Sequence, residues 1–294
     1  MKTFFRVSLY VITMLAACTP LSLLRATNSP KPVLPTRANP PLALTATLRP
    51  PTLTPLPTLL ADQAKARVFE LLNTNNGCKL PCFWGITSGH TSWSDAKSFL
   101  EAFSSRDSMS YFPQSTNFFS NFHFVVSSEN AIGLTLKLFV SNDSVRTIQV
   151  SDFDTPSYHL TEFLIKNGEP DQVWLLTYSQ VSYGGGDVVP FLVYLFYKDA
   201  QMIVAYGYGQ GTVKGEQITG CIEGSPSLYI WSLDKSLMFQ EAGQLGGYLQ
   251  PNDKFLEISD ATRGTLNTEK FYETFKVPGV ESCFQTPKNL WPGN

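Results

Sequence analysis

Residues 190–198, Pro-Phe-Leu-Val-Tyr-Leu-Phe-Tyr-Lys ("PFLVYLFYK"), place seven apolar or aromatic residues in a row. A short apolar run rich in aromatic and β-branched residues, with little alternation, predicts a strand that is covered on both faces. Such a strand belongs at the centre of a sheet. The runs "QVWLLTYS" at 172–179 and "QMIVAYGYG" at 201–209 predict strands on either side of it, and the short stretch "KDA" at 198–200 predicts the turn into the second of them.

A helix is predicted directly before these strands, over residues 155–170 ("TPSYHLTEFLIKNGEP"). Thr155 is a suitable capping residue, and Pro156 suits the first helical position. Gly168 is placed to end the helix in the left-handed conformation, and Pro170 prevents its continuation. The order in this part of the chain is therefore a helix followed by antiparallel strands.

The same order is predicted earlier in the chain. In "HTSWSDAKSFLEAF" at 90–103, Ser92 and Asp95 form a Ser-x-x-Asp capping box before a helix with one apolar face. Strands are predicted next at 121–128, 131–140 and 144–151. We therefore expect an α+β fold with helices packed on one face of an antiparallel sheet. It would comprise two helix–strand repeats and a disulfide-stapled carboxyl-terminal segment.

Two stretches carry a resemblance to known families. "GITSGHTSWSDAKSFL" and "FLIKNGEPDQV", within residues 84–208, resemble the helix starts and helix ends of β-lactamase inhibitor proteins and of the small lipoproteins of the outer-membrane barrel-assembly machine. This resemblance implies a tandem helix and antiparallel-sheet repeat. "GCKLPCFWGI" at 77–86 and the ending "FYETF…CFQTPKNLWP" are similar to lipoproteins of Chloroflexota-type bacteria, a resemblance that implies no function.

The amino terminus has the features of an export signal. Lys2 and Arg6 precede an apolar run of eleven residues, 7–17, which is shorter than the roughly 20 residues that span a bilayer. "LAAC" at 15–18 resembles a bacterial lipobox, which implies cleavage before Cys18 and acylation of that cysteine, including by palmitate. Two or more acyl chains give stable anchoring. The alternative is an ordinary cleaved signal with an incidental cysteine.

Residues 18–60 have the composition of a tether. They contain ten of the 20 prolines and eight threonines but no aromatic residue, so they cannot bury a core. Proline bias favours extended polyproline II conformations. The chain has 22 basic and 24 acidic residues; without the two bases of the signal and the four of the tether, sixteen bases remain against 24 acids. A body of charge about −8 argues against nucleic-acid binding, which requires a positive patch.

The cysteines after Cys18 are Cys78, Cys82, Cys221 and Cys283. An even number of cysteines in an exported chain predicts disulfide bonds. Three pairings are possible, and we favour Cys78–Cys82 with Cys221–Cys283. Zinc binding and redox activity are alternatives, but the Cys-x3-Cys spacing fits neither a zinc finger nor the usual Cys-x-x-Cys motif.

We divide the chain into four parts: a lipoprotein signal peptide at 1–17, a disordered tether at 18–60, a tandem repeat region at 61–211, and an extension at 212–294. In the extension, "ITGCIEG" and "SLYIWSL" predict additions to the sheet. "PNDKFLEIS" at 251–259 and "NTEKFYETFK" at 267–276 predict short helices. We expect the extension to pack on the same body as the repeats.

No catalytic or metal-binding motif stands out. His90, His123 and His159 are scattered, no Gly-x-Ser-x-Gly elbow is present, and no His-x-x-x-His pair offers a metal site. Acidic pairs such as Asp152 with Asp154 fit solvated turns. We therefore predict no cofactor, no metal and no enzyme activity, with an envelope hydrolase as one alternative and a passive surface protein as another.

Tyrosine is a frequent anchor residue at protein interfaces. We therefore predict an interaction surface at Tyr183, Tyr194, Tyr197, Tyr206 and Tyr208. The hypothesis from the sequence is a lipid-anchored protein of the cell membrane that faces outside the cytoplasm. Its partners would be the membrane, through the lipid, and an envelope protein or ligand, through the sheet face or loops.

Overall fold

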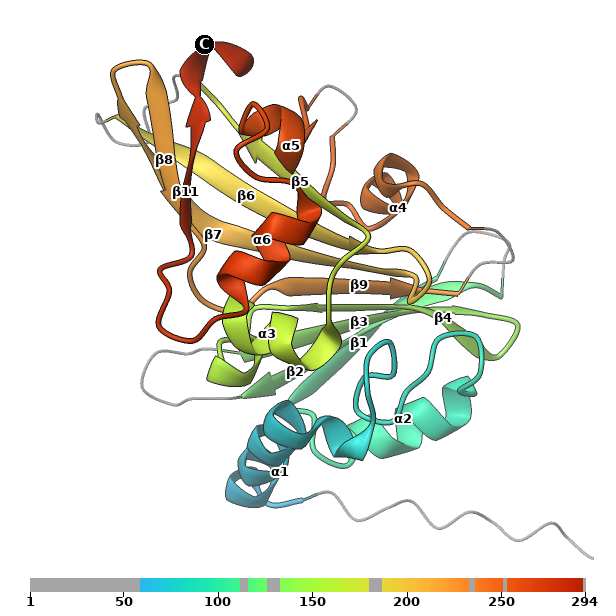
Figure 1. Ribbon diagram of the computed structural model, residues 1–294. Coiled ribbons are helices and arrows are strands. Elements are labelled where there is room, and N and C mark those ends of the chain that lie inside the picture. Colours follow the sequence, from blue (N-terminus) through green and yellow to red (C-terminus); the bar gives the residue numbers. More distant parts are fainter. Residues whose placement is uncertain are drawn as a thin grey trace, which may run out of the picture. The chain divides into compact units, whose positions relative to one another are not determined.

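The structure is a computed structural model that describes residues 59–111, 116–125, 133–179, 187–232, 236–250 and 253–292. These residues contain an antiparallel sheet of eleven strands with helices packed against it (Figure 1). Cys18, the predicted signal and the predicted tether up to residue 58 lie outside the described residues. Within them, no helix has both the length and the apolar character needed to cross a membrane.

The first half of the body consists of two helices and a four-stranded meander. α1 and α2 precede the strands, and α1 and β1 were not predicted from the sequence. The hairpin between β3 and β4 turns through Asn142 and Asp143, whose φ angles are 51° and 56°, the conformation of the two-residue turns that match strand twist. The bounds are α1 Ala61–Thr74, α2 Trp93–Glu101, β1 Arg106–Tyr111, β2 Phe118–Val125, β3 Gly133–Ser141 and β4 Ser144–Ser151.

The helix α2 begins as predicted. The backbone N–H of Asp95 donates to Ser92 Oγ at 3.1 Å, and Ser92 Oγ donates to Asp95 Oδ2 at 2.7 Å. Ala96, Leu100 and Phe103 are buried, so the predicted apolar face is the face that packs on the sheet.

In the second half, a 3-10 turn and one α-helix precede the strands. Gly168 ends α3, as predicted, with a φ of 83° that favours glycine, but its ψ of −170° is not that of the predicted left-handed conformation. The start is different: Pro156–Tyr158 forms a 3-10 turn and the α-helix begins only at Leu160. The Thr155 side chain does not cap the helix, because this residue is buried with its backbone N–H bonded to Ser225 Oγ at 2.8 Å. The bounds are α3 Leu160–Asn167, β5 Gln172–Thr177, β6 Val188–Tyr197, β7 Met202–Lys214 and β9 Ser227–Trp231.

The two halves join through β9. The sheet order is β1-β2-β3-β4-β9-β7-β6-β5-β10, and β9 is antiparallel to both of its neighbours. The last strand of the first meander thus lies beside the last strand of the second. β8 (Gln217–Cys221) pairs with β7 on one side and with β11 (Cys283–Pro287) on the other.

Alternate residues of the second-half strands belong to two separate hydrophobic cores. In β6, Val193 and Leu195 join the large core under α1, α2, α3 and α6, whereas Tyr194 and Phe196 join a smaller core on the opposite face. This confirms the prediction that 190–198 is covered on both faces.

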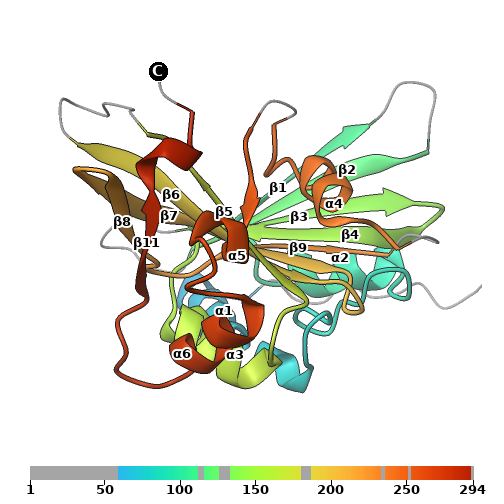
Figure 2. The ribbon, with the colours of Figure 1, turned by 45° about the horizontal axis from the view of Figure 1, so that its top comes forward.

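The cover on the opposite face is α4 (Phe239–Leu245) and the chain that follows it. Phe239, Ala242 and Leu249 pack there, and Figure 2 shows α4 across the sheet from α1, α2, α3 and α6. The prediction that the helices lie on one face only is therefore wrong for α4. Strand alternation points aromatic side chains of β6 and β9 towards this face, and without α4 they would be exposed to solvent.

The carboxyl-terminal segment packs on the same body. α6 (Thr268–Phe275) buries Phe271 and Phe275 in the large core, as predicted. The helix predicted over 251–259 is only partly present. Leu256–Glu257 forms the short strand β10 beside β5, and helix α5 covers Ile258–Ala261. The residues of β10 close the free edge of β5, which explains why they are extended.

Candidate functional site

The predicted tyrosine surface does not exist at three of its five positions. Tyr194, Tyr197 and Tyr206 are 2%, 6% and 1% exposed. Their hydroxyl groups donate inside the protein, to the carbonyl oxygens of Tyr248, Gly168 and Tyr158. Burial raises the pKa of each phenol. The prediction is therefore wrong for these residues, because both faces of β6 and β7 are covered. Tyr183 and the side chain of Tyr208 lie outside the described residues.

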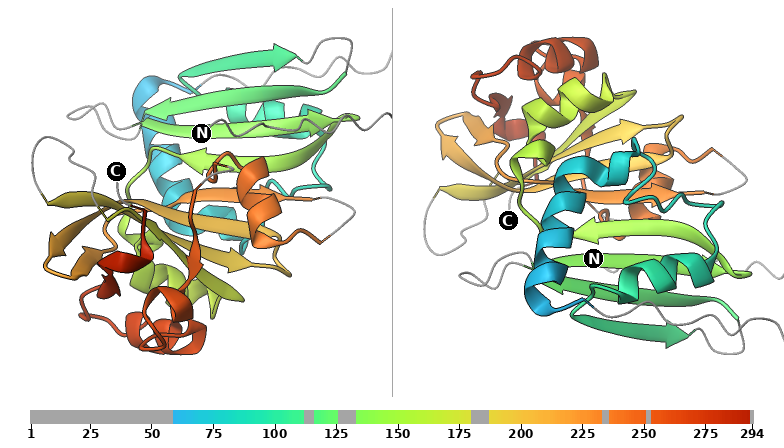
Figure 3. Two further views of the ribbon diagram at one scale, coloured as in Figure 1. Left: turned by 90° about the horizontal axis from the view of Figure 1, so that it is seen from above. Right: turned by 90° about the horizontal axis from the view of Figure 1, so that it is seen from below.

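A different part of the sheet is open. On β2, β3 and β4, every second side chain points away from the large core and is half-exposed. The smaller core under α4 contains residues of β5, β6, β7 and β9 but none of these three strands. Figure 3 (left) shows the green strands of the first half beside α4. We call this surface the open face; its residues are Phe119, Asn121, His123, Thr135, Lys137, Phe139, Thr147, Gln149 and Ser151.

Strand register orders the open face into rows. Phe119, Phe139 and Thr147 are direct neighbours across the three strands. Asn121, Lys137 and Gln149 form the next row, which continues to Tyr229 on β9. His123, Thr135 and Ser151 form the third, where Thr135 Oγ1 lies 3.2 Å from His123 Nδ1. One row is thus partly aromatic and the other two are polar.

A hollow of about 300 Å³ lies where the open face meets the end of α4. We call it the sheet hollow. Its floor is formed by side chains of the first two rows, and residues 245–247 form one wall. Leu245 is 59% exposed there. The floor side chains are Phe119, Lys137, Phe139, Thr147, Gln149 and Tyr229.

The sheet hollow combines apolar walls with one charge. Lys137 Nζ lies 4.4 Å from the centre of the Phe119 ring, a cation–π distance. Gln149 Nε2 donates to the Gly246 carbonyl at 3.4 Å. Burial raises the pKa of Tyr229 to about 12, although a hydrogen bond with Thr147 opposes the shift. Among the described residues that line the hollow, Lys137 is the only lysine, arginine, aspartate or glutamate.

Both favoured disulfide bonds are present. Cys78–Cys82 closes the loop after α1, and Cys221–Cys283 joins directly paired positions of β8 and β11. This confirms the pairing predicted from the sequence and leaves no support for zinc binding at these cysteines.

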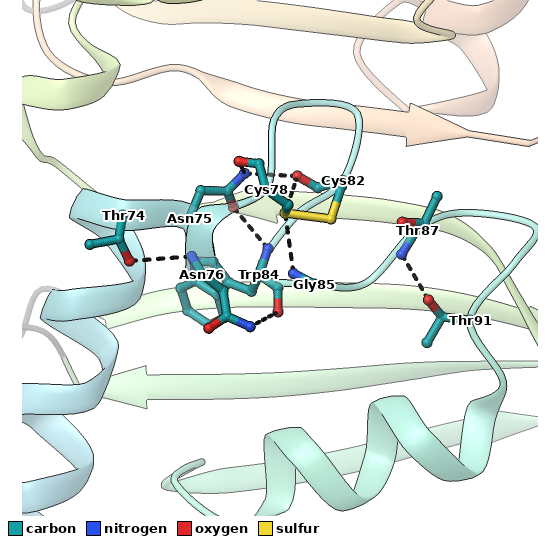
Figure 4. The surroundings of a disulfide bond; sticks show 9 residues. All are labelled: Thr74, Asn75, Asn76, Cys78, Cys82, Trp84, Gly85, Thr87 and Thr91. Atoms are coloured by element: carbon teal, nitrogen blue, oxygen red, sulfur yellow. Dashed lines mark hydrogen bonds between the residues drawn. A yellow bond between two sulfur atoms is a disulfide. The ribbon is translucent and has the colours of Figure 1, made fainter.

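Asn75 organises the first disulfide loop (Figure 4). Its side-chain amide donates to the carbonyl oxygens of Cys78 and Cys82 at 2.9 and 2.8 Å. Its Oδ1 accepts from the backbone N–H of Trp84 at 2.8 Å. The loop thereby turns Trp84 into the core, where it is 1% exposed. These contacts have a structural role, and sequence reasoning did not identify Asn75.

Asp154, His159 and Ser225 form a cluster of residue types that hydrolases use. His159 Nε2 lies 2.8 Å from Asp154 Oδ1, and Ser225 Oγ donates to the same oxygen at 3.1 Å. The serine hydroxyl thus contacts the carboxylate and not the imidazole, and Ser225 is buried. A nucleophilic serine needs a base within hydrogen-bond reach, and Ser225 has no such contact with His159. The cluster instead links the segment before α3, which contains Asp154 and His159, to the segment before β9, which contains Ser225.

The pKa of Asp154 is lowered. Burial raises it, but the hydrogen bonds from His159 and Ser225 outweigh that effect and favour the carboxylate. His90 and His123 lie apart from this cluster. Among the described residues, no group of three or more His, Cys, Asp or Glu side chains could hold a metal ion.

No protein-family model, no curated protein and no solved structure matches this chain.

Proposed function

We propose that this chain is a lipid-anchored, extracytoplasmic and non-enzymatic protein that binds an envelope protein or ligand through the open face of β2–β4. The observation on which this depends is the unequal cover of the sheet. On the face opposite the large core, α4 covers the strands of the second half of the sheet. On the same face, β2, β3 and β4 present half-exposed aromatic and polar side chains that are aligned across the strands. A surface that mixes aromatic with polar side chains is suited to reversible binding, because its polar groups remain hydrated when no partner is bound.

The proposed location is supported by the two disulfide bonds, which form and persist in oxidising compartments. The lipid at Cys18 is part of the proposal. Mass spectrometry of the mature amino terminus tests it directly. We expect a diacylglyceryl-modified and further acylated Cys18, and an unmodified terminus at another residue would contradict the anchor.

The proposed repeat is supported by strand order. α2 directly precedes the first meander and α3 the second, and the last strands of the two meanders, β4 and β9, are paired. Antiparallel pairing of equivalent strands is what a two-fold axis through the sheet would produce. Superposition of residues 93–151 on residues 160–231 tests the duplication, which requires α2 and α3 to coincide.

Site-specific photo-crosslinking in intact cells tests the binding role. A benzophenone amino acid would replace Thr135, in the polar third row of the open face. The matched control replaces Glu269, an exposed residue of α6 on the other side of the sheet. We expect a discrete adduct from position 135 and none of that size from position 269. Identical adduct patterns, or none from position 135, would contradict binding through the open face.

A further inference from the structure

The sheet hollow contains a basic side chain, Lys137, that has no acidic partner among the described residues. In the described part of the chain, Lys137 Nζ lies over the Phe119 ring, and no carboxylate lies within ion-pair distance of this nitrogen. Lys276 makes the same contact with Tyr272, at 4.4 Å, but also pairs with Glu273 at 2.6 Å. Lys137 thus differs from Lys276, whose charge is balanced by a neighbouring glutamate.

The surroundings of Lys137 would strengthen an interaction with an anion. The lysine is half-buried, and its aromatic neighbours Phe119 and Phe139 lie 5.3 Å apart, centre to centre. Charges interact more strongly where water is partly displaced. Other basic side chains of the described residues, such as Lys166 and Lys214, also make no ion pair, so Lys137 is distinguished by its position in the floor of the hollow.

The rest of the hollow is mostly apolar, and the hollow is small. A volume of about 300 Å³ corresponds to about ten water molecules and lies at the lower end of ligand pockets. Gly246 helps to shape the hollow: a Cβ at this position would lie 3.0 Å from the Tyr229 ring, so the absence of a side chain lets the backbone rest on the ring. The exposed Leu245 then stands beside the opening as an apolar wall.

We infer that the sheet hollow binds a small monoanion with an apolar body, of the aromatic-carboxylate class. The carboxylate pairs with Lys137, and the apolar body lies between Phe139 and Leu245. Thr147 and Gln149 on the floor supply further polar groups. This inference rests on the proposed binding role of the open face and deepens it by naming the ligand chemistry.

Ligand-observed NMR titration of the full-length protein, purified in detergent with its disulfides intact, tests the inference. The probes are naphthalene-2-carboxylate and its neutral isostere naphthalene-2-carboxamide, and empty micelles are titrated in parallel. We expect the carboxylate to bind about tenfold more tightly than the amide, as for one charge-assisted interaction. Lys137→Gln should abolish this difference. Lys166→Gln is the matched control, because Lys166 also lies over an aromatic ring, at 5.9 Å from Tyr158, but outside the hollow.

A second variant separates the apolar contribution from the charge. Leu245→Gln removes an exposed wall and should weaken both probes by a similar factor, while the preference for the carboxylate remains. Equal binding of the two probes, or a preference that survives Lys137→Gln, would overturn the inference. Photo-crosslinking from position 135 uses the third row, outside the hollow, so adducts without probe binding would reject the ligand class alone. If neither adducts from position 135 nor probe binding were observed, binding through the open face itself would be contradicted.

Discussion

Replacement of Asn75 by alanine should destabilise the protein by about 4 kcal/mol. The side chain is 1% exposed and makes three hydrogen bonds, to Cys78 O, to Cys82 O and from Trp84 N. At about 1 kcal/mol each, these bonds contribute about 3 kcal/mol. Asn75 also has φ 49°, where a residue with a Cβ other than Asn or Asp costs about 1 kcal/mol.

The neighbouring Asn76 provides the matched control. It has nearly the same backbone conformation, with φ 53°, but it is exposed, and its amide reaches Trp84 O at only 3.4 Å. Asn76→Ala should therefore cost about 1 kcal/mol, mostly from the backbone. Asn75→Gly removes the backbone cost and should recover about 1 kcal/mol relative to Asn75→Ala.

Urea unfolding of the oxidised protein, followed by tryptophan fluorescence, measures these free energies. The change should appear in the midpoint with an unchanged slope. If Asn75→Ala costs no more than Asn76→Ala, the three buried hydrogen bonds do not stabilise the loop and the reasoning fails.

Three further predictions concern the cross-links, the acid response and the packing of β8. Loss of the Cys221–Cys283 disulfide, whose cysteines are 62 residues apart, should lower the free energy of unfolding by about 4 kcal/mol. Loss of Cys78–Cys82, whose cysteines are four residues apart, should lower it by only about 2 kcal/mol, because a shorter loop restricts the unfolded chain less. Equal losses in urea unfolding of the paired Cys→Ser variants would contradict the loop-length argument. Because the pKa of Asp154 is lowered in the folded state, its stabilising effect is present above about pH 4 and is lost as the pH falls through the lowered pKa. The stability advantage of the wild type over Asp154→Asn should therefore shrink on acidification, and thermal melts showing a constant gap from pH 7 to pH 2 would refute it. Gly220→Ala should cost about 1–3 kcal/mol because its Cβ would clash with the Phe191 ring. Gly207→Ala, whose Cβ would meet Leu192 Cδ2 at 3.8 Å, should be nearly neutral, and similar melting temperatures for the two variants would show that the ring moves aside.

Local signals in the sequence were sufficient where one segment determines its own structure. The cap at Ser92, the helix end at Gly168 and the doubly covered run at 190–198 depend on near neighbours or on a continuous apolar run, and the structure contains all three. The full capping box and the left-handed conformation of Gly168 are not confirmed, because the Asp95 carboxylate bonds to the Ser92 hydroxyl and Gly168 has a ψ of −170°. The sequence also contains a pattern that indicates α1, because Val68, Leu71 and Leu72 follow helical spacing and are buried. This helix could therefore have been predicted.

The surface available for binding could not be predicted in the same way. The continuous apolar run at 190–198 predicts cover on both faces of the strand, but it does not show which segment provides that cover. Phe239 and Leu249, far along the chain, pack over Tyr194 and Phe196. The open face and its hollow depend on where α4 stops and on β9 lying beside β4.

The sequence by itself therefore determined most of the helices and strands and their order, because these follow from hydrophobic period and capping chemistry, and it favoured the observed cysteine pairing among three. Tertiary structure alone decided which face of the sheet remains open. Strand alternation offers two faces to every strand, and only contacts between residues distant in sequence determine which of them is covered.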